Sequence, residues 1–141
     1  MEEKYFNRYR SFCRSLRNLE KFADPTAEFV LEGTIRNYIL TFDLAWKVMK
    51  DILVKQLGIT DFAIGSPREV LQSAFTNGLI SDDIWLKMLK TRNLLAHDYD
   101  GIIAKKNFRA IISNYYDAFD GLKDAITKFY DGSLPSIDSF D

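Results

Sequence analysis

The chain has 141 residues, a length that suits one domain able to bury a core without disulfides or metals. Hydrophobic residues make up 47% and charged residues 28%, which is typical of an ordered globular protein. The net charge of −1 excludes polyanion binding by bulk charge, and the single Cys13, expected to be a buried small hydrophobe, excludes an internal disulfide framework. Since no apolar run is long enough to span a bilayer and residues 1–10 are unlike a signal peptide, we expect a cytoplasmic protein that is not membrane-bound.

Apolar side chains spaced by three and four residues predict a helix over 4–22. Ala23-Asp24-Pro25 ends it, because the residue before a proline avoids the helical region. Thr26 is expected to cap a long second helix over 27–57. Gly58 then suits the left-handed position that closes a helix, and a loop is expected to follow.

The third helix has a strong start signal. Ser66 can cap it, Pro67 suits its first turn, and Glu69 completes a capping box. Asn77-Gly78 is expected to end this helix.

The fourth helix is expected to begin after Ser81-Asp82-Asp83, which places carboxylates at its positive end. A turn at 98–101 leads to a last helix over 104–130. Trp46 and Trp85, at helical spacing, are expected to be structural residues of the core and not surfaces for base stacking. The sequence thus predicts an all-α, up-and-down antiparallel bundle of about five helices. One domain fills residues 1–130, and 131–141 form a C-terminal tail.

Several classes of site are excluded by residue type. One histidine and one cysteine cannot close a zinc site within one chain, and no phosphate-binding glycine loop is present. We therefore expect no metal and no cofactor. Gly65-Ser66 superficially resembles the Gly-Ser of nucleotidyltransferases, but it opens a capped helix with no well-spaced Asp-x-Asp behind it. The chain is not expected to be such a transferase itself.

The segment from Arg92 to Tyr99 carries the candidate chemistry. His97 is the only histidine, and its type of side chain titrates near neutrality, so it suits proton transfer. Arg92 is always charged and can grip phosphate through two parallel hydrogen bonds. When the 2′-hydroxyl of RNA attacks the neighbouring phosphate, cleavage needs a base, an acid and a cation that stabilises the phosphorane, and it needs no metal ion. A histidine and an arginine can supply these groups. The alternative is that Arg92 and His97 only complement the dipole at a helix C-terminus.

Helix geometry separates these two side chains. A step of five residues turns an ideal helix by about 500°, so Arg92 and His97 would point about 140° apart. They converge only if the helix end unwinds near Ala96, or if two chains pool their sites. One histidine per chain also cannot easily serve as both acid and base. Both points favour a symmetric homodimer with two copies of the motif facing one cleft.

The motif resembles a known family signature. Arg92 to His97 resembles the Arg-x4-6-His motif of HEPN domains, and Tyr99 extends it to the Arg-x4-His-x-Tyr form of HEPN toxins encoded beside a minimal nucleotidyltransferase. Over roughly residues 5–130 the chain resembles the nucleotidyltransferase substrate-binding proteins. The segments that carry this resemblance are 42–47, 66–70, 78–80, 85–89 and 92–99.

The resemblance implies a helical-bundle dimer whose Arg92 and His97 cleave RNA, with Asn93 in support. It also implies that a separate minimal nucleotidyltransferase acts as antitoxin by attaching AMP to Tyr99. The other interpretation of Tyr99 is a half-buried aromatic of a turn. Asp43 is expected as a polar residue near the cleft.

Two functions remain open at this point. The first is a metal-independent endoribonuclease toxin acting on RNA, not DNA, and silenced by AMPylation. The alternative is a non-catalytic substrate-binding subunit, in which Arg92 with Lys87 and Lys90 holds a nucleotide or a phosphorylated ligand. A plain helical adaptor is a third interpretation, and in it these lysines belong to ordinary solvated helix faces.

Overall fold

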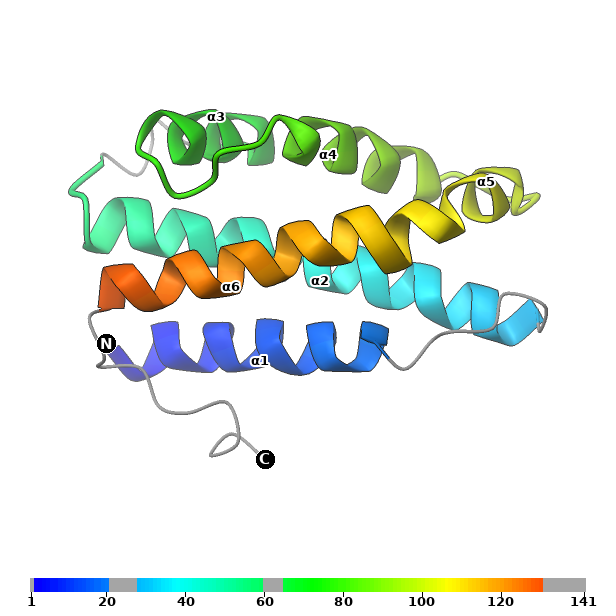
Figure 1. Ribbon diagram of the computed structural model, residues 1–141, viewed down its shortest axis with the longest axis horizontal. Coiled ribbons are helices and arrows are strands. Elements are labelled where there is room, and N and C mark those ends of the chain that lie inside the picture. The colour runs from blue at the N-terminus through cyan, green and yellow to red at the C-terminus, as the bar shows by residue number, and fades with distance from the viewer. Residues whose placement is uncertain (1, 21–27, 60–64, 131–141) are drawn as a thin grey trace.

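The computed structural model describes residues 2–20, 28–59 and 65–130, and within these ranges every regular element is a helix. Because α5, η2 and α6 follow one another without a break, the described chain forms five helical rods (Figure 1). The predicted all-α bundle is confirmed. The elements are α1 (Glu2–Glu20), α2 (Glu28–Lys55), α3 (Pro67–Thr76), α4 (Ile84–Leu95), α5 (Ile102–Ala110), η2 (Ile111–Tyr115) and α6 (Tyr116–Tyr130).

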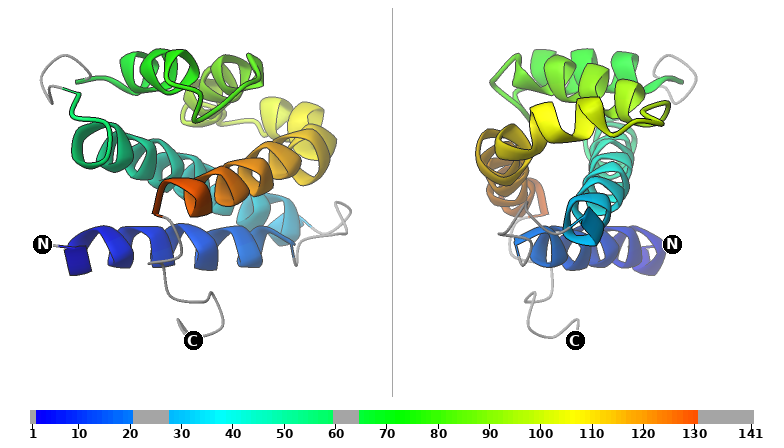
Figure 2. Two further views of the ribbon diagram at one scale, coloured as in Figure 1. Left: turned by 60° about the vertical axis from the view of Figure 1, so that its left-hand side comes forward. Right: turned by 90° about the vertical axis from the view of Figure 1, so that its right-hand side faces the viewer.

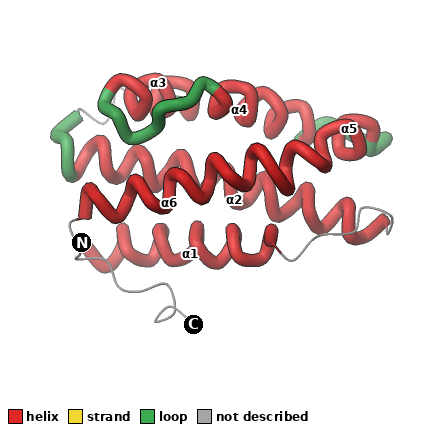
Figure 3. The backbone as a smooth tube through the Cα atoms, viewed as in Figure 1, coloured by secondary structure: helices red, strands yellow, loops and turns green. Residues whose placement is uncertain are grey.

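Helix α2 is the central element, because it packs against α1, α3, α4 and α5. In Figure 1, α1 lies on one side of α2, while α3 and α4 share the layer on the other side. The views in Figure 2 show α6 returning along α1, and the loops drawn green in Figure 3 lie at the ends and edges of the rods. This is the up-and-down order that short connections favour.

Aromatic rings fill the centre of the bundle. Tyr38 and Phe42 of α2 meet Trp85 of α4 and Phe119 of α6, with ring centroids between 5.6 and 6.3 Å apart for the contacting pairs. Trp85 is therefore a core residue, as predicted. Trp46, in contrast, is only partly buried and reaches the surface.

Cys13 is buried as well, and burial raises the pKa of its thiol. The prediction of a buried small hydrophobe at this position is confirmed.

The local signals for helix ends are largely confirmed. Ser66 Oγ accepts the amide N–H of Glu69 at 3.2 Å, and the Glu69 carboxylate accepts the amide N–H of Ser66 at 3.1 Å. Gly58 and Gly78 adopt the left-handed backbone with φ of 69° and 78°. Thr26 and the tail at 131–141 lie outside the described residues.

The last rod differs from the prediction in two ways. It begins at Ile102 rather than at 104, and its α-helix is interrupted by the π-helical segment η2. Such a segment inserts one extra residue into a turn and has no simple sequence signature. In the described ranges, no helix has a stretch long and apolar enough to cross a bilayer.

Candidate functional site

Arg92, in the last turn of α4, forms a two-pronged ion pair with Asp43 of α2. Arg92 Nε donates to Asp43 Oδ1 at 3.0 Å, and Nη2 donates to Oδ2 at 2.9 Å. The two side chains are 28% and 29% exposed, so the pair lies at the edge of the core. The hydrogen bonds that Arg92 donates to Asp43 raise the pKa of Arg92, which keeps the guanidinium charged. The expected polar residue near the cleft is thus the direct partner of Arg92.

The backbone behind Arg92 is anchored by two buried tyrosines that the sequence interpretation missed. Thr91 Oγ1 lies 3.0 Å from Tyr115 Oη, and Tyr38 Oη donates to the carbonyl of Met88 at 2.8 Å. The two tyrosine rings stack with centroids 5.6 Å apart. Burial raises the pKa of Tyr38, so it remains a neutral donor. The last turns of α4, which carry Arg92, are therefore fixed by hydrogen bonds on the side that faces the core.

A small surface hollow of about 270 Å³ lies in front of the ion pair. It brings together Arg92, Asn93 and Asp43, three of the predicted site residues, and it adds Trp46, which had been assigned to the core. The residues that line it are Phe42, Asp43, Trp46, Lys47, Pro67, Leu89, Arg92 and Asn93. We call it the Arg92 hollow.

His97 lies outside the Arg92 hollow, exposed on the turn that follows α4. After the Ala96 amide, which still donates to the carbonyl of Arg92, the His97 amide donates to the carbonyl of Leu94 at 3.2 Å. This three-residue bond tightens the helix end, so that one residue turns by about 120° instead of 100°. Arg92 and His97 then point about 160° apart. The helix end therefore tightens instead of unwinding, and His97 does not join Arg92 in lining the Arg92 hollow.

Tyr99 lies in the turn between α4 and α5, which is stabilised by hydrogen bonds to Asp98. The Asp98 carboxylate accepts the amide N–H groups of Ile103 at 3.1 Å and Ala104 at 2.7 Å, and so caps α5. Gly101 allows the turn by adopting φ of 72°. Tyr99 itself is 92% exposed. The interpretation of Tyr99 as a half-buried aromatic is wrong, because Asp98, and not packing of the ring, orders the turn.

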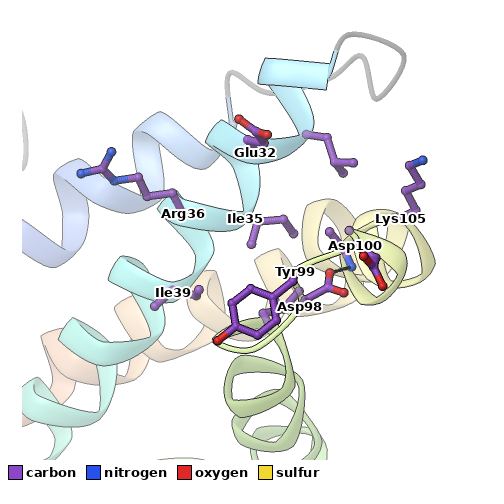
Figure 4. Close-up of a pocket in the computed structure, with 12 residues that line it drawn as sticks. Glu32, Ile35, Arg36, Ile39, Asp98, Tyr99, Asp100 and Lys105 are labelled. Carbon is purple, nitrogen blue, oxygen red and sulfur yellow. Dashed lines mark hydrogen bonds between the residues drawn. The ribbon is translucent and has the colours of Figure 1, made fainter.

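A second hollow, of about 660 Å³, opens beside Tyr99. Figure 4 shows the Tyr99 ring on the rim, with its hydroxyl toward α2 and Ile39 nearby. The residues that line this Tyr99 hollow are Leu31, Glu32, Ile35, Arg36, Ile39, Leu95, Asp98, Tyr99, Asp100, Gly101, Ala104 and Lys105.

The two hollows are neighbours along the seam between α2 and α4. On α2, Ile39 lines the Tyr99 hollow and Asp43 lines the Arg92 hollow. These positions are one turn apart, or about 6 Å along the helix axis. On α4, Leu95 lines the Tyr99 hollow and Arg92 lines the Arg92 hollow. The two hollows therefore adjoin each other on this seam.

Two other predicted substrate-binding residues lie elsewhere. Lys87 and Lys90 are exposed on α4 and line neither hollow. Within the described ranges, no group of three or more histidine, cysteine, aspartate or glutamate side chains is placed to hold a metal ion.

Comparison with known proteins identifies one family. A family model described as nucleotidyltransferase substrate binding protein like matches residues 4–128. The match includes Asp43 of α2 and the whole segment from Arg92 to Tyr99. No curated protein matches the sequence at a significant level.

Proposed function

The chain belongs to the nucleotidyltransferase substrate-binding-protein-like family, and from this premise we propose that it is the HEPN-type partner of a separate minimal nucleotidyltransferase. The chain acts as a metal-independent endoribonuclease toxin in the form of a homodimer. The transferase is its antitoxin and silences it by transferring AMP to Tyr99. The family description, which names a nucleotidyltransferase, supports the choice of partner.

The exposure of Tyr99 is the observation that carries this proposal. A transferase must bring the α-phosphorus of a nucleoside triphosphate up to the phenol oxygen, and a side chain that is 92% exposed permits that approach. The phenol oxygen forms the new P–O bond, pyrophosphate leaves with the electrons of the broken P–O bond, and the phenol proton passes to a base or to water. The capped turn holds the acceptor in one place during this step.

Attachment of AMP would silence the site through charge and bulk. The new phosphodiester carries a negative charge and stands at the Tyr99 hollow, which adjoins the Arg92 hollow along the seam between α2 and α4. It would compete with RNA phosphate for Arg92 and repel the incoming strand. This supports the assignment of Tyr99 as the regulatory position.

In the proposed cleavage, Arg92 holds the scissile phosphate and stabilises the charge that develops on it. The RNA 2′-hydroxyl attacks phosphorus and gives its proton to a base, while the 5′-oxygen leaves and takes a proton from an acid. Because each chain supplies a single His97, which lies outside its own Arg92 hollow, the dimer brings the two copies of the motif to one cleft. The two copies of His97 then act as base and acid.

The divergence of Arg92 and His97 also favours a second candidate. If the chains do not pool their residues, Arg92, paired with Asp43, would only grip a phosphate, with Lys87 and Lys90 giving long-range attraction. The chain would then be a non-catalytic subunit that binds a nucleotide or a phosphorylated ligand for its transferase.

Cleavage of an end-labelled RNA in EDTA distinguishes the two. The purified chain, Arg92→Ala and His97→Ala are compared, after intact mass has excluded AMP already attached to Tyr99. The toxin proposal expects cleavage by the wild type and loss of it in both variants. An unmodified wild-type dimer that leaves RNA intact would refute the toxin proposal and favour the second candidate.

A parallel incubation with the transferase and ATP tests Tyr99. The wild type should gain the mass of AMP and lose cleavage, whereas Tyr99→Phe should remain unmodified and active. Labelling of Tyr99→Phe to the same extent as the wild type would show that Tyr99 is not the acceptor.

A further inference from the structure

We propose that the Arg92 hollow is a subsite for one nucleotide, with Trp46 as the platform for its base and Arg92 as the grip for its phosphate. The nucleotide belongs to a single-stranded RNA and lies next to the phosphate that is cleaved. The position next to a cleaved phosphate rests on the proposed function. Binding of the nucleotide itself does not depend on cleavage.

Trp46 is placed differently from the other tryptophan of the chain. Trp85 is 3% exposed and enclosed by rings of the core, whereas Trp46 packs against the core with one part and lines the hollow with another. Packing on one side restrains the indole ring. Binding of a ligand therefore costs little conformational entropy for immobilising this side chain. An aromatic surface held in this way is what an unstacked nucleobase binds, at a gain that depends little on which base it is.

Cations flank this aromatic surface. Lys47 Nζ lies 5.8 Å from the centre of the Trp46 ring, a distance typical of cation–π attraction. An incoming base can replace the ammonium over the ring, and the flexible lysine can turn to the phosphate.

Arg92 supplies the second cation. Its hydrogen bonds to described residues use Nε and Nη2, both directed at Asp43. Among the described residues, none accepts a hydrogen bond from Nη1. The neighbouring Asn93 adds an exposed amide at the same wall. A phosphate can therefore accept a hydrogen bond from Nη1 of Arg92, whose guanidinium is already oriented by Asp43.

The size of the hollow limits the ligand to one nucleotide at most. Its volume of about 270 Å³ lies just below the range of about 300–1,000 Å³ that is usual for small-molecule sites. A folded or paired RNA presents stacked bases that cannot enter it. The subsite therefore selects single-stranded RNA, with a base splayed out of its strand.

Nuclear magnetic resonance of the two indole N–H groups tests the proposal directly. The chain has two tryptophans, and loss of one signal in Trp46→Phe assigns both. The ¹⁵N-labelled wild type, free of attached AMP and in EDTA, is titrated with 5′-AMP, and then with ribose 5-phosphate, which lacks the base.

We expect 5′-AMP to shift the Trp46 indole signal and to leave that of Trp85 in place. Ribose 5-phosphate should shift the Asn93 signals but barely move the Trp46 indole. Equal shifts of Trp46 with both ligands, or no shift with millimolar 5′-AMP, would overturn the base platform.

A pair of variants measures the contribution of the ring. Trp46→Leu should weaken 5′-AMP binding roughly five- to a hundredfold by calorimetry, and Trp46→Phe should weaken it less. Both must first show the wild-type helical spectrum. Unchanged affinity of a folded Trp46→Leu would refute the subsite. A chain that binds 5′-AMP in this way yet leaves RNA intact would refute the nuclease and keep the subsite. Unchanged 5′-AMP affinity together with unchanged cleavage in Trp46→Leu would refute the subsite and keep the nuclease.

Discussion

The Arg92–Asp43 pair should be a measurable contributor to stability, and a double-mutant cycle isolates its contribution. The cycle compares Asp43→Ala, Arg92→Ala and the double variant with the wild type. Exposed ion pairs couple by about 0.2–1 kcal/mol, whereas breaking a fully buried pair costs about 3–5 kcal/mol. The two side chains are 28% and 29% exposed and share two charge-assisted hydrogen bonds. We therefore expect a coupling free energy of about 1–2 kcal/mol.

The free energies of unfolding are measured by urea titration, followed by helical circular dichroism. All four proteins are kept at one concentration, because association would otherwise shift the apparent stability. The longer i,i+3 pair Lys123–Asp120 provides a control within α6. Its nitrogen and oxygen are 3.7 Å apart, and its side chains are 28% and 48% exposed. Its coupling should stay below about 0.5 kcal/mol.

A coupling for Arg92–Asp43 no larger than that of the control pair would refute the reasoning. Asp43 would then not hold Arg92, and the orientation of the guanidinium toward the Arg92 hollow would lose its physical basis.

Three further outcomes follow from individual contacts. Ser66→Ala removes the cap of α3 and should lower the free energy of unfolding by about 1 kcal/mol, while the exposed Ser11→Ala should change it by less than about 0.5 kcal/mol in the same urea titration. Tyr115→Phe leaves the buried hydroxyl of Thr91 without its partner and should cost about 1–2 kcal/mol; a smaller loss than in Ser11→Ala would contradict the role of the anchor behind Arg92. Cys13 is 4% exposed with a pKa raised by burial, so an aromatic disulfide reagent should modify it only after unfolding in urea, and immediate modification of the folded chain would contradict its burial.

The helices could be predicted because their signals are local. Apolar spacing within each segment, together with the capping box at Ser66 and the glycines at 58 and 78, determines where most rods begin and end. The interruption at η2 could not be predicted, since a π-turn is stabilised by what it faces across the bundle. Here it includes Tyr115, which meets Thr91 of α4.

The candidate site could be predicted in its residues and only in part in its arrangement. Arg92, Asn93 and Asp43 do meet at one hollow. Lys87, Lys90 and His97 line neither that hollow nor the one beside Tyr99. Trp46 was expected in the core because helical spacing shows which face of a helix is apolar, but not how deep each position on that face lies.

The sequence by itself thus determined the rods, their caps and the segment that carries the candidate chemistry. These features depend on residue type and on neighbours within a few positions. Only the tertiary structure decided that Arg92 faces Asp43, 49 residues away, that the two share a hollow with Trp46, and that Tyr99 stands exposed. Such relations arise from how α2 and α4 pack side by side, and no local pattern along the chain specifies the angle at which two helices meet.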